Sequence, residues 1–166
     1  LGIPAEPLFR SRDFQRGREW ERLVNVEFYE PNNSGINQQC GLRMHGNHGR
    51  RAPAKGMKIY AREEYGKKRF KHRFFDTTPI KSFKHLVIKP FSILWPETGV
   101  QDYVTNRMAL AMGLEAPNSR PVVLYLNGEY WGIYFLQERL DESVISRSEE
   151  RFSRNAETDL VCRLLL

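Results

Sequence analysis

The sequence contains few cysteines and no long apolar run. Its 166 residues include only Cys40 and Cys162, which lie far apart and form no CxxC or Cys/His ligand spacing. The spacing favours two free thiols over a disulfide between them. No segment approaches the roughly 18 consecutive apolar residues that a membrane-spanning helix needs, so no membrane span is predicted.

Common catalytic and ligand motifs are also missing. The four histidines (His45, His48, His72 and His85) show no metal-ligand spacing and no serine or aspartate arrangement of the kind found in hydrolase triads. The glycine-bearing loop that begins at Gly46 is neither a GxxxxGK[ST] phosphate loop nor a GxGxxG loop. These absences leave no predicted metal site and no predicted hydrolase.

The composition indicates a folded, basic protein. Hydrophobic residues make up 40% and aromatic residues 12% of the chain, enough for a core. The formal net charge of +6 fits an anionic partner such as a nucleotide, an acidic protein or a nucleic acid, and it fits an ordinary basic domain equally well.

The pattern of apolar residues predicts an α+β fold, with an antiparallel sheet and a packed helix. Alternation predicts strands at 23–29, 41–45, 55–62 and 84–91, and a 3.6-residue period predicts a helix at 100–113. A polar helix is expected at 139–154 and an apolar element at 159–166. The expected organisation is an approach segment at 1–22, a sheet-rich unit at 23–138, and the start of a second lobe at 139–166.

Residues 122–138 predict a hairpin that ends in a carboxylate. Asn127-Gly128 between apolar runs is typical of a type I′ turn, which would place Tyr125 opposite Tyr130 and Leu124 opposite Trp131. Both faces of the second run are apolar, so both should be covered, with Glu138 at the rim. Glu138 is then either paired with Arg139, Arg107 or a backbone donor, or it serves a binding site.

Two further residues are expected in structural ion pairs on the helix at 100–113. Arg107 lies in the middle of the predicted apolar face, where a buried guanidinium needs an acidic partner. Asp102 lies near the opposite side of the same helix and is the second candidate for such a pair.

Basic residues gather around the loop GNHGRRAPAKGMK. They can hold a polyphosphate, or they can form a solvated basic hairpin, and spacing alone leaves both open; they are Arg43, Arg50, Arg51, Lys55 and Lys58. A second basic stretch, 67–73, contains Phe70 and is interpreted as a solvated hairpin tip. Nucleic-acid binding through that stretch is the weakest hypothesis, because it rests on charge alone.

Four segments together resemble one known family. RGREWERLVNVEFYEP, GLRMHGNHGRRAPAKGMKIYAREEYG, DYVTNRMALAMG and VVLYLNGEYWGIYFLQERLDE occur in this order between about residues 16 and 161. They resemble the spore-coat CotH family of atypical, secreted protein kinases. The resemblance implies a kinase-like N-terminal lobe leading into a truncated C-terminal lobe, and a location outside the cell, on its surface or in the spore coat.

The resemblance also implies a chemistry. A CotH-like kinase binds ATP with Mg²⁺ or Mn²⁺ and transfers phosphate to Ser or Thr of partner proteins. Lys55 lies where the family's catalytic PKKS-type lysine falls, with Arg43, Arg51 and Lys58 as further nucleotide-binding candidates. Glu138 matches the glutamate that closes the family's NGxYxGxYxLxE pattern.

The sequence departs from the family pattern in two respects. His45 and His48 stand where the family commonly has Arg and Ser. The family's metal-binding and catalytic aspartates follow a segment resembling DLVCRLLL, with which this sequence ends. The alternative hypothesis is therefore a non-catalytic coat or cell-surface module that uses the same fold to bind proteins.

Overall fold

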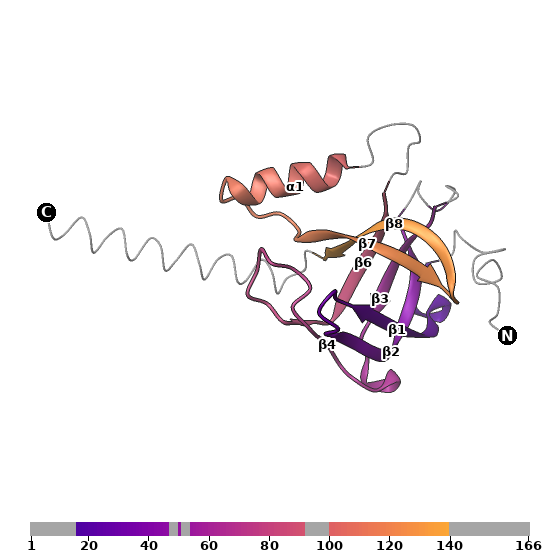
Figure 1. Cartoon of the computed structure of the whole chain (residues 1–166). Coiled ribbons are helices and arrows are strands. Elements are labelled where there is room, and N and C mark those ends of the chain that lie inside the picture. Colours follow the sequence, from indigo (N-terminus) through magenta and orange to yellow (C-terminus); the bar gives the residue numbers. More distant parts are fainter. Residues whose placement is uncertain (1–15, 47–49, 51–53, 92–99, 140–166) are drawn as a thin grey trace, which may run out of the picture.

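A six-stranded antiparallel sheet dominates the protein. The computed structural model describes residues 16–46, 50, 54–91 and 100–139 (Figure 1). The strand order is β1-β2-β3-β6-β8-β7. These strands are β1 (Arg22–Tyr29), β2 (Gly35–His45), β3 (Gly56–Tyr60), β6 (His85–Pro90), β7 (Ser119–Leu126) and β8 (Glu129–Glu138). The remaining elements are a small sheet of β4 (Phe70–Lys71) and β5 (Ser82–Phe83), the helix α1 (Gln101–Ala111) and the 3-10 turns η2 (Arg18–Trp20) and η4 (Glu63–Tyr65).

The predicted hairpin forms, with one change of register. Asn127 and Gly128 have φ of 52° and 81°, as a type I′ turn requires, and Tyr125 pairs with Tyr130 as predicted. The expected pairing of Leu124 with Trp131 is wrong, because Leu124 pairs with Gly132. The register shifts between Leu124 and Tyr125, so a β-bulge inserts one extra residue on β8.

The core lies on one face of the sheet. Met57 and Ile59 of β3 face it together with Leu86 of β6 and Leu136 of β8, all almost fully buried. Four phenylalanines from the segment between β3 and β6 cover this face; they are Phe70, Phe74, Phe75 and Phe83. The basic stretch at 67–73 is therefore not simply a solvated tip, since it buries Phe70 and exposes its lysines.

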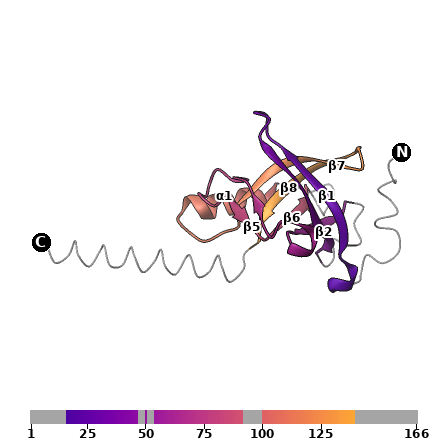
Figure 2. The ribbon, with the colours of Figure 1, turned by 90° about the horizontal axis from the view of Figure 1, so that it is seen from below.

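The sheet curls until its two edges meet at one end. Strands β1 and β7 are the outermost strands, yet Arg120 of β7 donates hydrogen bonds of 2.6 and 3.1 Å to Glu30, which directly follows β1. The same guanidinium donates to the Phe74 carbonyl oxygen at 3.2 Å. Seen from below, the β1–β2 hairpin arches over the curled sheet, away from α1 (Figure 2). The open sheet is thus held as a half-barrel around its apolar face.

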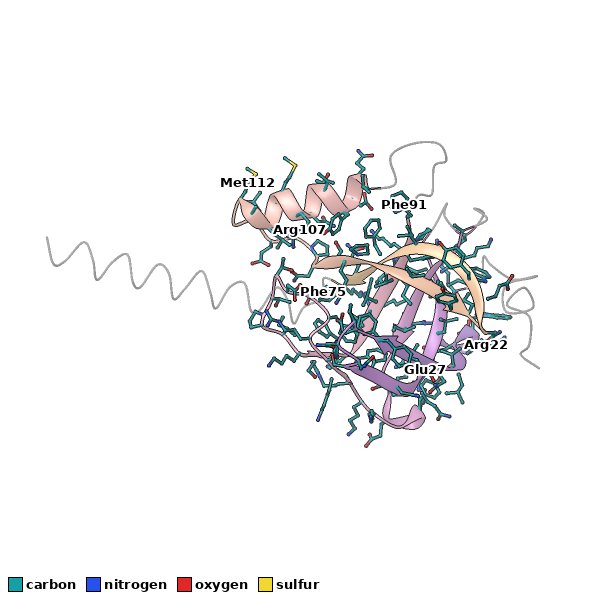
Figure 3. The ribbon with its side chains drawn as sticks, in the orientation of Figure 1. Arg22, Glu27, Phe75, Phe91, Arg107 and Met112 are labelled. Carbon is teal, nitrogen blue, oxygen red and sulfur yellow. The ribbon has the colours of Figure 1, made fainter. Side chains whose placement is uncertain are left out.

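The expected α+β fold with a packed helix is wrong. The helix forms, but α1 buries none of its side chains, and Met108 is 60% exposed. Met112 projects away from the sheet (Figure 3). Helix α1 is joined to the sheet by the ring of Tyr103, which stacks on Phe135 of β8 with the ring centroids 5.1 Å apart, and by the pairing of Asp102 with Lys89 of β6. The apolar period correctly predicts the helix. The core, however, is completed by the phenylalanines of the segment between β3 and β6. The fold is therefore mostly β and is not a helix-packed, kinase-like lobe.

Some predictions fall on residues that the structure does not describe. Arg51, the helix at 139–154 and the apolar element at 159–166 lie outside the described residues, apart from Arg139.

Cys40 is a free, buried cysteine, and burial raises its pKa to about 12. In the described part of the chain, no helix is long and apolar enough to cross a membrane.

Candidate functional site

The face of the sheet opposite the core carries a row of paired positions across five strands, and four of these positions hold polar residues. Directly paired positions run from Arg43 to Lys58, then to Val87, Gln137 and Ser119. Residues directly opposite each other in an antiparallel sheet point to the same face. Alternation therefore places Lys58 on this face while its neighbours Met57 and Ile59 enter the core. We call the set Arg43, Lys58, Gln137 and Ser119 the polar row.

The polar row is largely shielded from solvent. Lys58 is 6% exposed, and Gln137 and Ser119 are similarly buried. The Ser119 hydroxyl is buried without a hydrogen-bond partner among the described residues. A buried hydroxyl without a partner destabilises the folded protein unless a ligand or water forms a hydrogen bond with it. The row thus combines a buried cation with at least one polar group that can still bind.

Two cations of the row stand directly opposite each other. Like charges at paired positions of a sheet repel, and Arg43 and Lys58 are such a pair. The ring of Tyr60 lies near both, 4.1 Å from the Arg43 guanidinium carbon and 5.0 Å from the Lys58 Nζ. Cation–π attraction to this ring offsets part of the repulsion. An anion bound between the two side chains would offset more of it.

His45 reports the positive potential at this end of the face. Its pKa lies below the ordinary 6.5, first because of burial and then because of four surrounding cations. Those cations are Lys58, Lys89, Arg50 and Arg139. Four strands and loops therefore bring positive charge toward one imidazole, which favours the binding of an anion nearby.

Acidic side chains lie at the margins of this face. Glu21 accepts hydrogen bonds from Arg62 at 2.7 and 3.1 Å and lies 3.4 Å from the Nε of Arg43. At the other end, Asp102 lies 3.3 Å from the Nζ of Lys89. These carboxylates lie beside individual cations at the two ends of the face.

Lys55, the lysine singled out by family resemblance, lies outside the polar row. It precedes β3, and its Nζ donates a 2.7 Å hydrogen bond to the carbonyl oxygen of Arg50. Its ammonium therefore helps to close the loop between β2 and β3. Of the basic candidates, the structure brings Arg43 and Lys58 together, and Lys55 belongs to the adjoining loop.

Glu138 faces the core side of the sheet. It pairs with Leu86, and its Oε2 accepts a 2.6 Å hydrogen bond from the amide of Asn118. The Asn118 Oδ1 accepts a 2.5 Å hydrogen bond from Thr77. Because side chains alternate along a strand, Gln137 lies in the polar row, and Glu138 lies on the opposite face.

The two expected ion-pair residues on α1 lie apart from the polar row. Asp102 pairs with Lys89 rather than with Arg107. Arg107 is exposed (Figure 3). It lines a hollow of about 300 Å³ with Thr77, Leu110 and Leu114. The prediction of a buried Arg107 assumed that the apolar stripe of α1 faces a core, which it does not.

The fit to a nucleotide with a divalent metal is uneven. Lys58, Arg43 and the Ser119 hydroxyl suit phosphate oxygens, since ammonium, guanidinium and hydroxyl groups all donate hydrogen bonds. Within residues 16–46, 50, 54–91 and 100–139, no group of three or more His, Cys, Asp or Glu side chains could hold a metal ion. The described residues thus fit the phosphates but provide no metal site.

Comparison with known proteins gives the family. The family model described as CotH kinase protein matches residues 42–158, which include the polar row from Arg43 to Gln137. This chain belongs to the CotH family. No curated protein matches it. The resemblance read from the sequence is therefore confirmed at the level of the family.

Gln137, Ser119 and Lys89 of this CotH chain were missed by sequence reasoning. Lys89 lies on a predicted strand and Gln137 on the predicted hairpin, whereas Ser119 precedes that hairpin; none of the three was named as a site residue. Their common feature is their position in the sheet, which depends on which strands are neighbours and in what register. The order β3-β6-β8, which skips the intervening segments, is not visible in the spacing of residues along the chain.

Proposed function

We propose that this CotH chain is the nucleotide-binding part of a protein kinase that transfers the terminal phosphate of ATP to Ser or Thr of partner proteins. The supporting observation is the buried Lys58 opposite Arg43 on a positively charged sheet face. Family membership supports the same proposal. A role at the cell surface or in the spore coat, with a coat or surface protein as acceptor, belongs to this proposal.

In the proposed role, Lys58 and Arg43 neutralise the phosphate oxygens of ATP. Phosphoryl transfer depends mainly on positioning and on stabilising negative charge, which a buried ammonium does more strongly than an exposed one. The Ser119 hydroxyl can donate a hydrogen bond to the same oxygens. Mg²⁺ or Mn²⁺ would supply charge neutralisation across the phosphates, and its ligands would have to come from outside the described residues.

The proposal reassigns the phosphate-binding lysine. Family resemblance pointed to Lys55, whereas the geometry favours Lys58, which lies in the polar row. Lys55 can still act indirectly, because its bond to the Arg50 carbonyl oxygen orders the loop beside the row.

ATP-dependent stabilisation tests the proposal. Ligand bound only to the folded state raises the melting temperature. We expect ATP with Mg²⁺ or Mn²⁺ to raise it for the wild type and for Lys71→Ala, whose exposed lysine lies on β4. Lys58→Ala should lose the shift, and Lys55→Ala should retain part of it. Transfer of label from γ-labelled ATP to an acceptor protein should follow the same order in a chain that carries the metal ligands.

One observation favours a second candidate, the non-catalytic protein-binding module. Several apolar side chains of α1 and its following turn are exposed, notably Met108, Met112 and Leu114. Exposed apolar clusters commonly mark interaction surfaces. If ATP produces no melting shift in any variant, including the wild type, the binding module becomes the better explanation.

A further inference from the structure

The outer edge of β7 presents unpaired backbone groups. The Asn118 carbonyl oxygen accepts a 2.8 Å hydrogen bond from the Glu138 N–H, which fixes the phase of the β7–β8 ladder. Backbone groups alternate in direction along an antiparallel strand, so those of Pro121, Val123 and Tyr125 point away from β8. In the part of the chain that the structure describes, no strand pairs with this side of β7. Pro121, which has no N–H, occupies an outward-facing position where none is needed.

Apolar side chains line the same edge. Val123 is 58% exposed and Tyr125 is 60% exposed, while Tyr130 and Ile133 of β8 continue the exposed surface. The rings of Tyr125 and Tyr130 meet edge to face at 5.6 Å. From Pro121 to Leu126 the strand has no charged residue. Long apolar edges without charge are the edges that accept another strand.

The opposite edge of the sheet differs. The Glu30 N–H donates to the Ser34 carbonyl oxygen at 2.8 Å, so the backbone groups of Leu23, Asn25 and Glu27 point outward from β1. Glu27 accepts hydrogen bonds from Asn25 at 3.3 Å and from Tyr29 at 2.8 Å. A charged, hydrogen-bonded side-chain network therefore covers β1, as is usual for edges that must not pair. From Pro121 to Leu126, β7 has no such charged network, and Pro121 is the one residue of this stretch that blunts the edge.

We propose that β7 binds an extended, acidic segment of a partner protein as a seventh strand of the sheet. Backbone groups of Val123 and Tyr125 would pair with the segment, and alternate apolar residues of the segment would lie against Val123 and Tyr125. The charge of the chain selects the occupant: with a net charge of +6, two copies repel each other, whereas an acidic segment is attracted. This surface is distinct from the polar row and does not depend on the proposed kinase activity.

A designed peptide tests the proposal with the whole 166-residue chain. The probe has the eight-residue length of β7, alternates Val or Tyr with Glu, and carries a fluorophore. Binding is followed by anisotropy, and protection of the Val123 and Tyr125 amides by hydrogen exchange. A second peptide of the same sequence is N-methylated at alternate residues and cannot form the ladder. A third has Lys in place of Glu.

Two proline variants serve as a matched pair. Val123→Pro removes an outward N–H from β7, and Leu23→Pro removes one from β1; the replaced side chains are similarly exposed, at 58% and 56%. Because neither N–H belongs to the sheet ladder, both variants should fold, which circular dichroism checks. We expect Val123→Pro to weaken binding of the acidic peptide by about tenfold or more, since a ladder hydrogen bond and its neighbours are lost. Leu23→Pro should bind as the wild type does.

Each outcome decides the proposal. Binding that is lost with N-methylation, weakened with the Lys peptide and accompanied by protection of Val123 and Tyr125 supports it. Equal binding to wild type and Val123→Pro, or equal binding of the N-methylated peptide, overturns it. Dimerisation of the wild type that Val123→Pro abolishes would assign the edge to a second copy of the chain and overturn the acidic-partner assignment.

Discussion

The two faces of the six-stranded sheet are built from alternate residues of the same strands and serve different purposes. On β3, Met57 and Ile59 enter the apolar core, while Lys58 between them joins a positively charged face. The core face excludes water, and burying its apolar side chains stabilises the fold. The other face holds the like charges of Arg43 and Lys58 close together, and the repulsion between them does not stabilise the fold. The comparison indicates that the first face stabilises the fold, whereas the second is the face on which we propose that ATP binds.

The largest effect should come from placing a charge on the core face. Met57 is fully buried, so Met57→Lys would bury an ammonium among apolar side chains. We expect a loss of unfolding free energy of about 4 kcal/mol or more, because such a charge finds no partner in a core. Urea denaturation measures the loss. A well-folded Met57→Lys with near wild-type stability would show that the two faces are not distinct.

A cavity beneath the sheet should have the next largest effect. Phe74 is 1% exposed and meets Phe28 and Phe83 edge to face at 5.1 and 5.6 Å. Phe74→Ala should cost about 3–5 kcal/mol of unfolding free energy, from lost burial and the remaining cavity. Leu23→Ala, at a position that is 56% exposed on the opposite face, is the control and should cost less than about 1 kcal/mol.

Local pattern was enough to find most strands, and it failed where distant segments meet. Alternation located β1, β3 and β6, and Asn127-Gly128 located the hairpin turn. The phenylalanines near 70–83 are spaced among lysines and arginines with no helical or strand period, so their common burial could not be inferred. Helix α1 was found from its period, but a period does not tell whether a core faces the helix.

The candidate site shows the same limit. Arg43 and Lys58 were both named from the sequence, but their direct pairing depends on the β2–β3 register. Glu138 was expected at a binding rim. Because side chains alternate along β8, Gln137 lies on the polar face, and Glu138, one residue later, lies on the core face. The bulge on β8, which changes the pairing of Leu124, has one signal in the sequence that was not used: Gly132, an isolated glycine within the strand pattern, which has a φ of 109°.

A pH-dependent contribution should come from the ion pair that joins the sheet edges. Hydrogen bonds from Arg120 lower the pKa of Glu30 below its ordinary 4.5, with His72 adding a smaller effect. A depressed carboxyl pKa stabilises the fold above the ordinary pKa, and this stabilisation is lost as the pH falls through the folded-state value. Arg120→Met should therefore cost about 1–3 kcal/mol at neutral pH and less below about pH 4.5.

Denaturation of wild type and Arg120→Met over a range of pH measures this difference. Arg73→Met is the control, because Arg73 is exposed and its hydrogen bond to the Asp76 carbonyl oxygen involves no titrating group. A gap between wild type and Arg120→Met that stays constant from neutral to acidic pH would mean that Glu30 is not the partner that matters.

The smallest effect on stability should come from neutralising the polar face. Lys58→Met removes one of two opposed cations, so the loss of like-charge repulsion with Arg43 offsets part of the interactions that the ammonium makes. We expect the unfolding free energy to change by less than about 1 kcal/mol, in contrast to the large loss for Met57→Lys one residue away. The His45 pKa should rise in this variant but stay below 6.5, because burial is its main cause and Lys58 contributes the largest of the charge effects. Histidine proton shifts followed by NMR against pH measure the change, with Lys71→Met as the control that leaves His45 unchanged. If Lys58→Met loses as much stability as Met57→Lys, then Lys58 stabilises the fold as a core residue does, and the polar row loses its main support as a binding site.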